Sequence, residues 1–344
     1  MSRANKASRL ITRRALLHSA LAIPMLAASE RVRSQARVLD WQGFVPVGGI
    51  EQWISIRGRS ASNAVLLFLH GGPGEALSPF PSVSEPWERT CTVVQWDQRG
   101  SGKTHARSPS TANDMTLERL TRDAIELAEY VRERLDKDKI ILAGHSWGSM
   151  IGWTIAVNRP DLFHAYVGTG QAVNWTRSVE GQETYARAQA GAAGDEAALQ
   201  AMDQAREARF DSFDRTAPYR AWIMPPSDVE FIMMLRDYAA GSRRVPQQRD
   251  VAQWVRGSSF SLETLGSEIP RFDAYATGLD VQIPVVVIQG REDHLTPSEA
   301  AADLVRDVRA PTKKFVSITG GHFACFTNAE GFAAALAEHV VPLI

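Results

Sequence analysis

Cysteine is scarce in this chain, which has only Cys91 and Cys325 among its 344 residues. Small exported domains that depend on disulfides carry many more, so this class of protein is excluded. Cys91 opens an expected strand and Cys325 lies in an expected helix, which favours two buried free thiols. From the sequence, a single bridge between them stays open.

An excess of charge of either sign is also lacking. The 38 lysines and arginines nearly balance the 39 aspartates and glutamates, and the basic residues are dispersed. Nucleic-acid-binding proteins usually carry a basic patch, so no nucleic-acid partner is expected. The chain has no internal repeat and no low-complexity tract. A hydrophobic share of 44% is enough for one large core with an inserted lobe, or for two domains.

Long apolar runs are missing near the N-terminus. The apolar segment 15–28 is shorter than the ~20 residues that comfortably cross a bilayer. It follows a basic head with no acidic residue before Glu30, and small residues that suit a cleavage site occur at 27–29 and 34–36. This order is typical of an export signal, which we place at residues 1–36.

The pair Arg13-Arg14 lies directly before this apolar segment and resembles a twin-arginine signal. We therefore expect a bacterial protein that meets the membrane only transiently during export and is then periplasmic or secreted. An ordinary Sec signal and an uncleaved anchor are the alternatives.

The most informative stretch is Gly144-His145-Ser146-Trp147-Gly148, which matches the Gly-x-Ser-x-Gly pattern of a nucleophile elbow. The pattern is short enough to recur by chance, so its flanks matter. Residues 139–143 are typical of a buried strand and residues 149–157 of an apolar helix. Because glycines permit a sharp strand-to-helix turn, Ser146 is predicted to be a nucleophile. A turn that simply reverses the chain is the alternative.

Apolar runs that predict buried strands alternate with helical patterns along most of the chain. We expect an α/β fold with a mostly parallel sheet and flanking helices. Its core comprises residues 44–171 and 281–344, and residues 172–280, which lack strand signals, form a helical cap over the ligand crevice. The strand runs are 49–57, 64–69, 92–96, 139–143, 165–169, 284–289 and 314–318, and helices are expected at 115–135 and 332–341.

A serine nucleophile needs a base and an orienting acid, which follow core strands in the chain order serine, acid, histidine. The loop after 284–289 supplies Asp293, and the loop after 314–318 supplies His322. We predict that His322 takes the serine proton and that Asp293 holds the imidazole, with Glu292 as the alternative acid. A surface-loop histidine and a helix-capping aspartate are the structural alternatives. The other histidines show no metal-ligand spacing, so neither a metal nor a cofactor is expected.

An oxyanion hole is the remaining requirement. It combines the N–H after the nucleophile with an N–H from the loop after an early strand. Trp147 follows Ser146, and Gly72 lies in a glycine-rich loop directly after the strand run 64–69. We predict Gly72 and Trp147 as the donors, with a ligand-free Gly-Pro turn as the alternative. The other residues of this predicted active-site loop are His70, Gly71, Pro73 and Gly74.

Three loops taken together carry a family resemblance. They are 70–74 (HGGPG), 97–104 (DQRGSGKT) and 144–149 (GHSWGS). In this combination the chain resembles the prolyl iminopeptidase branch of the α/β-hydrolases. The resemblance covers about 49–172 and 281–344, and it implies an eight-stranded-type α/β-hydrolase core with a helical cap. It also implies structural roles for Asp97 and Arg99, for which a buried ion pair is the simplest interpretation.

The resemblance implies a Ser-His-Asp hydrolase that forms an acyl-enzyme on a small-molecule or short-peptide substrate, most simply a prolyl iminopeptidase-like aminopeptidase. A carboxylesterase or lactonase and a non-catalytic ligand-binding homologue are the alternatives. Epoxide hydrolase and dehalogenase chemistry is disfavoured, because those relatives carry a carboxylate nucleophile at the position of Ser146. The oligomeric state stays open. Prolyl iminopeptidases bind the substrate amine with acidic cap residues, and the carboxylates available here, which solvated helix faces explain equally well, are Glu180, Glu183, Asp228 and Glu230.

Overall fold

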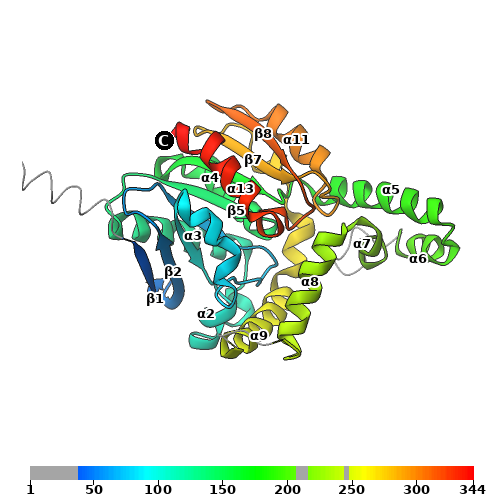
Figure 1. Cartoon of the computed structure of the whole chain (residues 1–344), viewed down its shortest axis with the longest axis horizontal. Coiled ribbons are helices and arrows are strands. Elements are labelled where there is room, and N and C mark those ends of the chain that lie inside the picture. The colour runs from blue at the N-terminus through cyan, green and yellow to red at the C-terminus, as the bar shows by residue number, and fades with distance from the viewer. Residues whose placement is uncertain (1–37, 207–215, 244–247) are drawn as a thin grey trace, which may run out of the picture.

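A central eight-stranded sheet organises the molecule (Figure 1). The computed structural model describes residues 38–206, 216–243 and 248–344, so the predicted export signal lies outside the described residues. The strand order is β1-β2-β4-β3-β5-β6-β7-β8. The pairs β1–β2 and β2–β4 are antiparallel, whereas all other neighbours are parallel. The predicted fold class, a mostly parallel α/β sheet, is therefore confirmed.

Each strand run expected from the sequence forms a strand. Strand β1 was not expected from the sequence, and it begins before residue 44, where the core was predicted to start. This edge strand alternates exposed and partly buried residues and pairs with β2 through a turn at Gly48 and Gly49. The strands are β1 (Leu39–Val47), β2 (Ile50–Gly58), β3 (Val65–Leu69), β4 (Thr92–Trp96), β5 (Ile140–His145), β6 (Phe163–Thr169), β7 (Val285–Gly290) and β8 (Lys313–Ile318).

Helices cover both faces of the sheet (Figure 1). In β3, Leu67 belongs to one hydrophobic cluster and Leu66 and Phe68 to the other, which explains its unbroken apolar sequence. The core helices are η1 (Pro81–Arg89), α2 (Gly102–Arg107), η2 (Ala112–Asp114), α3 (Leu117–Arg134), α4 (Trp147–Asn158), η3 (Pro160–Leu162), α11 (Ser298–Asp307), α12 (Ala324–Thr327), α13 (Ala329–His339) and η6 (Val341–Leu343).

Between β6 and β7 the described residues form helices and no named strand. Figure 1 shows α5 and α6 projecting away from the core. None of the helices in the described ranges is long and apolar enough to cross a membrane. The helices of this insertion are α5 (Trp175–Ala193), α6 (Glu196–Arg206), α7 (Ala217–Ile223), α8 (Pro226–Ala239), α9 (Gln248–Leu265), η5 (Gly266–Arg271) and α10 (Ala274–Thr277).

The two thiols and the 97–104 loop test further expectations. Both cysteines are free and buried, as predicted.

The expected ion pair between Asp97 and Arg99 is wrong. Arg99 Nε instead lies 2.7 Å from Asp123 Oδ2 on α3, whereas Asp97 accepts hydrogen bonds from Ser78 Oγ and the N–H of Lys103. Burial raises the pKa of Asp97 to about 7, against the effect of these hydrogen bonds. The loop has a structural role, but Arg99 pairs with Asp123 of helix α3 and not with Asp97.

Candidate active site

Ser146 lies at a sharp turn between β5 and α4, with φ 52° and ψ −118°. A positive φ is unfavourable for a residue with a side chain and costs about 1–3 kcal/mol, which the surrounding structure must offset. A Cβ on Gly148 would lie 2.1 Å from Leu69 O, and a Cβ on Gly144 would lie 2.4 Å from Gly148 O. Both glycines are therefore required by close packing, and the elbow is more than a chain reversal.

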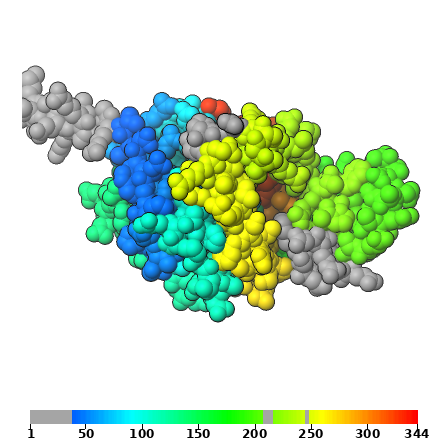
Figure 2. Space-filling view, turned by 90° about the horizontal axis from the view of Figure 1, so that it is seen from below, coloured from blue at the N-terminus to red at the C-terminus, as the bar shows by residue number. Residues whose placement is uncertain are grey.

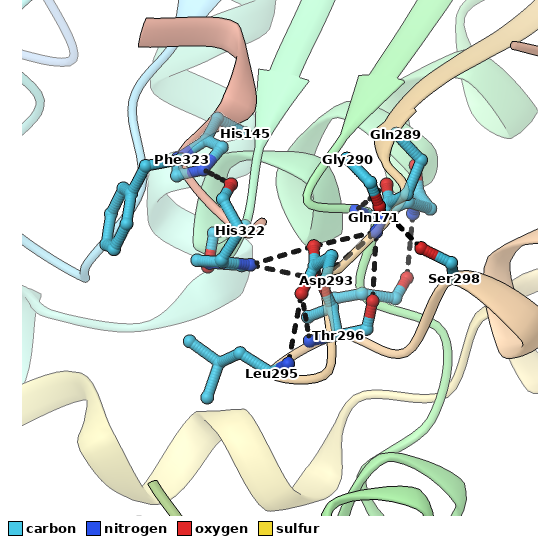
Figure 3. A network of polar contacts seen from close by, with 12 residues as sticks. His145, Gln171, Gln289, Gly290, Asp293, Leu295, Thr296, Ser298, His322 and Phe323 are labelled. Carbon is cyan, nitrogen blue, oxygen red and sulfur yellow. Dashed lines mark hydrogen bonds and ion pairs between the residues drawn. The ribbon is translucent and has the colours of Figure 1, made fainter. Parts of the chain in front are cut away.

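Asp293 and His322 meet at the carboxyl ends of β7 and β8 (Figure 3). His322 Nδ1 lies 3.1 Å from Asp293 Oδ2, and both residues are buried. Glu292, the alternative acid, is exposed. Asp293 also accepts hydrogen bonds from Gln289 Nε2, Thr296 Oγ1 and the backbone N–H groups of Leu295 and Thr296. This set of donors holds the carboxylate of Asp293 in place.

The carboxylate sets both the tautomer and the charge of His322. When Nδ1–H donates to Asp293, Nε2 is free to act as a base. Burial is the largest single effect and lowers the pKa of His322, but the charge and hydrogen bond of Asp293 together with the charge of Asp228 outweigh it, and the pKa is raised. Among the described residues no hydrogen bond joins Ser146 Oγ to His322, although both line one cavity. Such contacts often tighten only when substrate binds.

Two other histidines surround the elbow and remain neutral. Burial lowers the pKa of His145 to about 3 and that of His70 to about 4. His145 Nε2 donates to His322 O at 3.0 Å, and His70 Nδ1 donates to Gly71 O at 2.9 Å. His70 Nε2 in turn accepts from the N–H of Gln98. These imidazoles connect the elbow, the histidine loop and the glycine loop without carrying charge.

Asp228, at the start of α8, reaches the catalytic region from the cap. It is fully buried, and its Oδ2 accepts the backbone N–H of His322 at 2.6 Å. A Cβ on Gly321 would lie 2.3 Å from the same oxygen, so the histidine loop needs glycine there. From the sequence, Asp228 was a candidate only as an amine ligand or as part of a solvated helix face. The sequence can indicate that Asp228 lies in the first turn of a helix, but it cannot show that this side chain contacts the backbone of His322 across the fold.

The glycine loop passes directly beside the elbow. A Cβ on Gly71 would lie 3.2 Å from Ser146 Cβ, and Gly72 has φ 115°, which disfavours other residues. Trp147 is the first residue of α4, so its N–H has no acceptor within the helix. Its indole Nε1 donates to Gln98 Oε1 at 3.2 Å. The structure thus brings both predicted oxyanion donors to the cavity that contains Ser146.

The cavity has a volume of about 400 Å³ and lies between the sheet edge and the inserted helices. Figure 2 shows a hollow between the α8–α9 side and the α5–α7 side of the insertion, with C-terminal residues in orange and red at its bottom. Among the described residues, its lining has one carboxylate, Glu75, and no cluster suited to a metal ion occurs. Two arginines, Arg220 and Arg236, also line the cavity. Its walls include the aromatic side chains Phe80, Trp175, Phe231, Trp254, Phe272 and Phe323.

A serine elbow after β5, with an acid and a histidine on later strand ends, defines an α/β-hydrolase architecture. Residues 64–329 match the family described as alpha/beta hydrolase fold, and the chain belongs to this family.

Among curated proteins, the chain is 27% identical over 312 residues to the probable aminopeptidase YbaC of Bacillus subtilis, across 85% of this chain and 94% of that protein. It is 31% identical over 109 residues to a proline iminopeptidase of Lactobacillus delbrueckii subsp. lactis, across 31% and 36% of the two chains. The resemblance to the prolyl iminopeptidase branch is thereby confirmed.

Solved structures share the fold. A proline iminopeptidase-related protein of Thermus thermophilus superposes with a TM-score of 0.57 at 20% identity, covering 89% of this chain and 99% of that chain. An epoxide hydrolase of Vigna radiata reaches a TM-score of 0.54 at 20% identity, covering 88% and 97%. Enzymes of different chemistry share this architecture, so the reaction must be argued from the site.

Proposed function

We propose that this α/β-hydrolase is a serine hydrolase that removes the N-terminal residue from short peptides or related small amides. The observation that carries the proposal is the strained Ser146 elbow, which shares one cavity with the Asp293–His322 pair and the Gly71–Gly72 loop. The names of its relatives, a probable aminopeptidase and a proline iminopeptidase, support the amide-cleaving activity. The inserted helices narrow the approach to Ser146, which favours small or terminal substrates.

The proposed mechanism uses side chains and backbone groups of the chain itself. His322 Nε2 takes the proton of Ser146 Oγ as the oxygen attacks the substrate carbonyl carbon. The N–H groups of Gly72 and Trp147 donate to the developing oxyanion, and Asp293 stabilises the imidazolium. His322 then transfers the proton to the leaving amine, and the acyl-enzyme forms. Water, activated by the same histidine, releases the acid product and restores Ser146.

A substrate panel tests the proposal. Purified protein is assayed with aminoacyl-naphthylamides, including the prolyl derivative, and with short acyl esters of matched size. We expect turnover of the amides that carry a free amino group. Turnover of esters alone would contradict the aminopeptidase assignment.

A carboxylesterase or lactonase is the second candidate function, and one observation favours it. Much of the cavity wall is apolar, and none of the four cap carboxylates Glu180, Glu183, Asp228 and Glu230 lines the cavity. An uncharged ester can bind through such apolar walls without an ionic partner. A third candidate is a non-catalytic binding protein. If this candidate is right, the folded protein should not react with a fluorophosphonate probe.

The pH dependence of kcat/KM should report the raised pKa of His322. Because the base must be neutral, activity falls as the pH drops through this pKa, and we expect the midpoint above 6.5, the ordinary value for histidine. In Asp228→Asn the amide oxygen still accepts the His322 N–H, but the negative charge is gone. The midpoint should then move down by roughly one pH unit. The measurement is a pH profile of kcat/KM with either an amide or an ester substrate.

Glu230→Gln is the matched control for this prediction, because Glu230 lies on the same helix but is exposed. Its profile should coincide with that of the parent protein. An unchanged midpoint in Asp228→Asn would show that Asp228 only supports the loop.

We also propose that residues 1–36 direct export through the twin-arginine route, on the basis of the Arg13-Arg14 pair and the apolar segment that follows. Fused to a reporter, this segment should send the reporter to the periplasm. Replacing both arginines by lysine should retain the reporter inside the cell. Export that persists in the double variant would favour a Sec signal instead.

A further inference from the structure

Glu75 is a carboxylate in the catalytic cavity for which the proposed mechanism has no use. It directly follows the glycine loop and is the single acidic side chain in the described lining. The four cap carboxylates considered from the sequence lie elsewhere. Glu183 pairs with Arg187 at 2.9 Å, Asp228 holds the His322 backbone, Glu180 borders a separate surface hollow, and Glu230 is exposed.

The backbone places the side chain of Glu75 beside the oxyanion loop. Its N–H donates to Gly71 O at 3.2 Å, and a Cβ on Gly72 would lie 3.1 Å from Glu75 Cγ. Gly71 in turn approaches Ser146 closely, since a Cβ on Gly71 would lie 3.2 Å from Ser146 Cβ. A group held by Glu75 therefore lies within about one substrate residue of the carbonyl that Ser146 attacks.

The carboxylate of Glu75 has hydrogen-bond donors, and no cation in the described part of the chain pairs with it. Arg220 and Arg236 also line the cavity, but neither contributes to the pKa shift of Glu75. Oε1 accepts from Ser258 Oγ at 2.9 Å, and the side chain of Trp254 is a second donor; both residues lie on α9. Among the described residues, no lysine, arginine or histidine forms an ion pair with it. Burial raises the pKa of Glu75, and the two hydrogen bonds oppose this effect. Glu75 is partly buried, and a carboxylate that is partly withdrawn from water without a counterion is costly, so a bound cation relieves that cost.

The surroundings suit an organic ammonium better than a metal ion. The neighbouring walls contain Phe80, Trp175 and Trp254, and aromatic faces attract alkylammonium groups. Metal ions need several oxygen or nitrogen ligands, whereas the described residues offer no cluster of this kind here.

We propose that Glu75 binds the free amino group of the substrate, so that the enzyme selects amides with an unblocked ammonium next to the scissile carbonyl. This inference rests on the proposed aminopeptidase function and deepens it. The anchor comes from the core loop next to the oxyanion hole, and Ser258 of the cap orients it. Substrates with a blocked amino group leave the carboxylate unpaired and are rejected.

Glu75→Gln tests the proposal, because glutamine keeps the shape and an acceptor for Ser258 but removes the charge. For an aminoacyl-naphthylamide we expect kcat/KM to fall about 100-fold, mostly through KM. For an acyl ester without an amine we expect less than roughly threefold change, since no charge pair is lost. Glu230→Gln is the control and should leave both substrates unaffected. Equal losses on both substrates, or loss of amine preference in Glu230→Gln, would overturn the proposal.

A binding measurement separates this proposal from the proposed function. Ligand-observed NMR compares n-butylammonium with n-butanol, which has similar size and no charge, and needs no turnover. The parent protein should bind the ammonium at least about tenfold more tightly than Glu75→Gln does, with equal binding of the alcohol. Equal binding of the ammonium by both proteins overturns the role of Glu75. Absent amide turnover with intact ammonium binding would instead contradict only the peptidase function.

Discussion

Replacing Ser146 by alanine should abolish turnover, with kcat lower by about 10⁶-fold, the scale on which triad serines contribute in other serine hydrolases. The hydroxyl is the only group removed, and the backbone at φ 52° stays compatible with alanine to the same degree as with serine. The variant should also lose reaction with a fluorophosphonate probe. Steady-state kinetics and probe labelling measure the two effects independently.

Ser62→Ala is the control for this experiment, because Ser62 is exposed and precedes β3, whereas the glycine loop of the cavity follows that strand. It should retain full turnover and labelling. A thermal unfolding curve of Ser146→Ala that matches the parent protein would exclude misfolding as the cause. Turnover close to normal in Ser146→Ala would show that Ser146 is not the nucleophile. If the parent protein did not react with the fluorophosphonate probe, the non-catalytic alternative would be supported.

The second large effect is expected for Asp293→Asn, with kcat lower by roughly 10⁴-fold. An asparagine amide can present an N–H to His322 Nδ1 and so favour the tautomer with a proton on Nε2. That tautomer cannot accept the proton of Ser146. The charge that raises the pKa of His322 is also lost, so the acid limb of the pH profile should move to lower pH. Kinetics across pH 5–9 with the best substrate measure both changes.

Glu292→Gln is the matched control for Asp293→Asn, since it removes the adjacent and exposed carboxylate. Full activity in Glu292→Gln supports Asp293 as the acid that orients His322. The reverse result, with activity lost in Glu292→Gln and kept in Asp293→Asn, would reassign the acid.

Much of the fold and the central site residues were predictable, because their signals are local. Strand runs buried on both faces are continuously apolar, as in β3. The elbow needs small residues where backbones approach, which is visible as Gly144 and Gly148. Chain order then pointed to Asp293 and His322 directly after later strands. The edge strand β1 escaped because its half-exposed pattern lacks a strong hydrophobic signal.

Local periodicity and glycine placement therefore determined the architecture, the elbow and the chain positions of the acid and the histidine, since these depend on neighbouring residues. The partners of buried charges depend on packing between distant segments, and only the tertiary structure decided them. It joined Arg99 to Asp123 on α3 and brought Asp228 of the cap onto His322. It also placed Glu75 in the catalytic cavity with no paired cation among the described residues, because chain segments far apart in sequence shape that space.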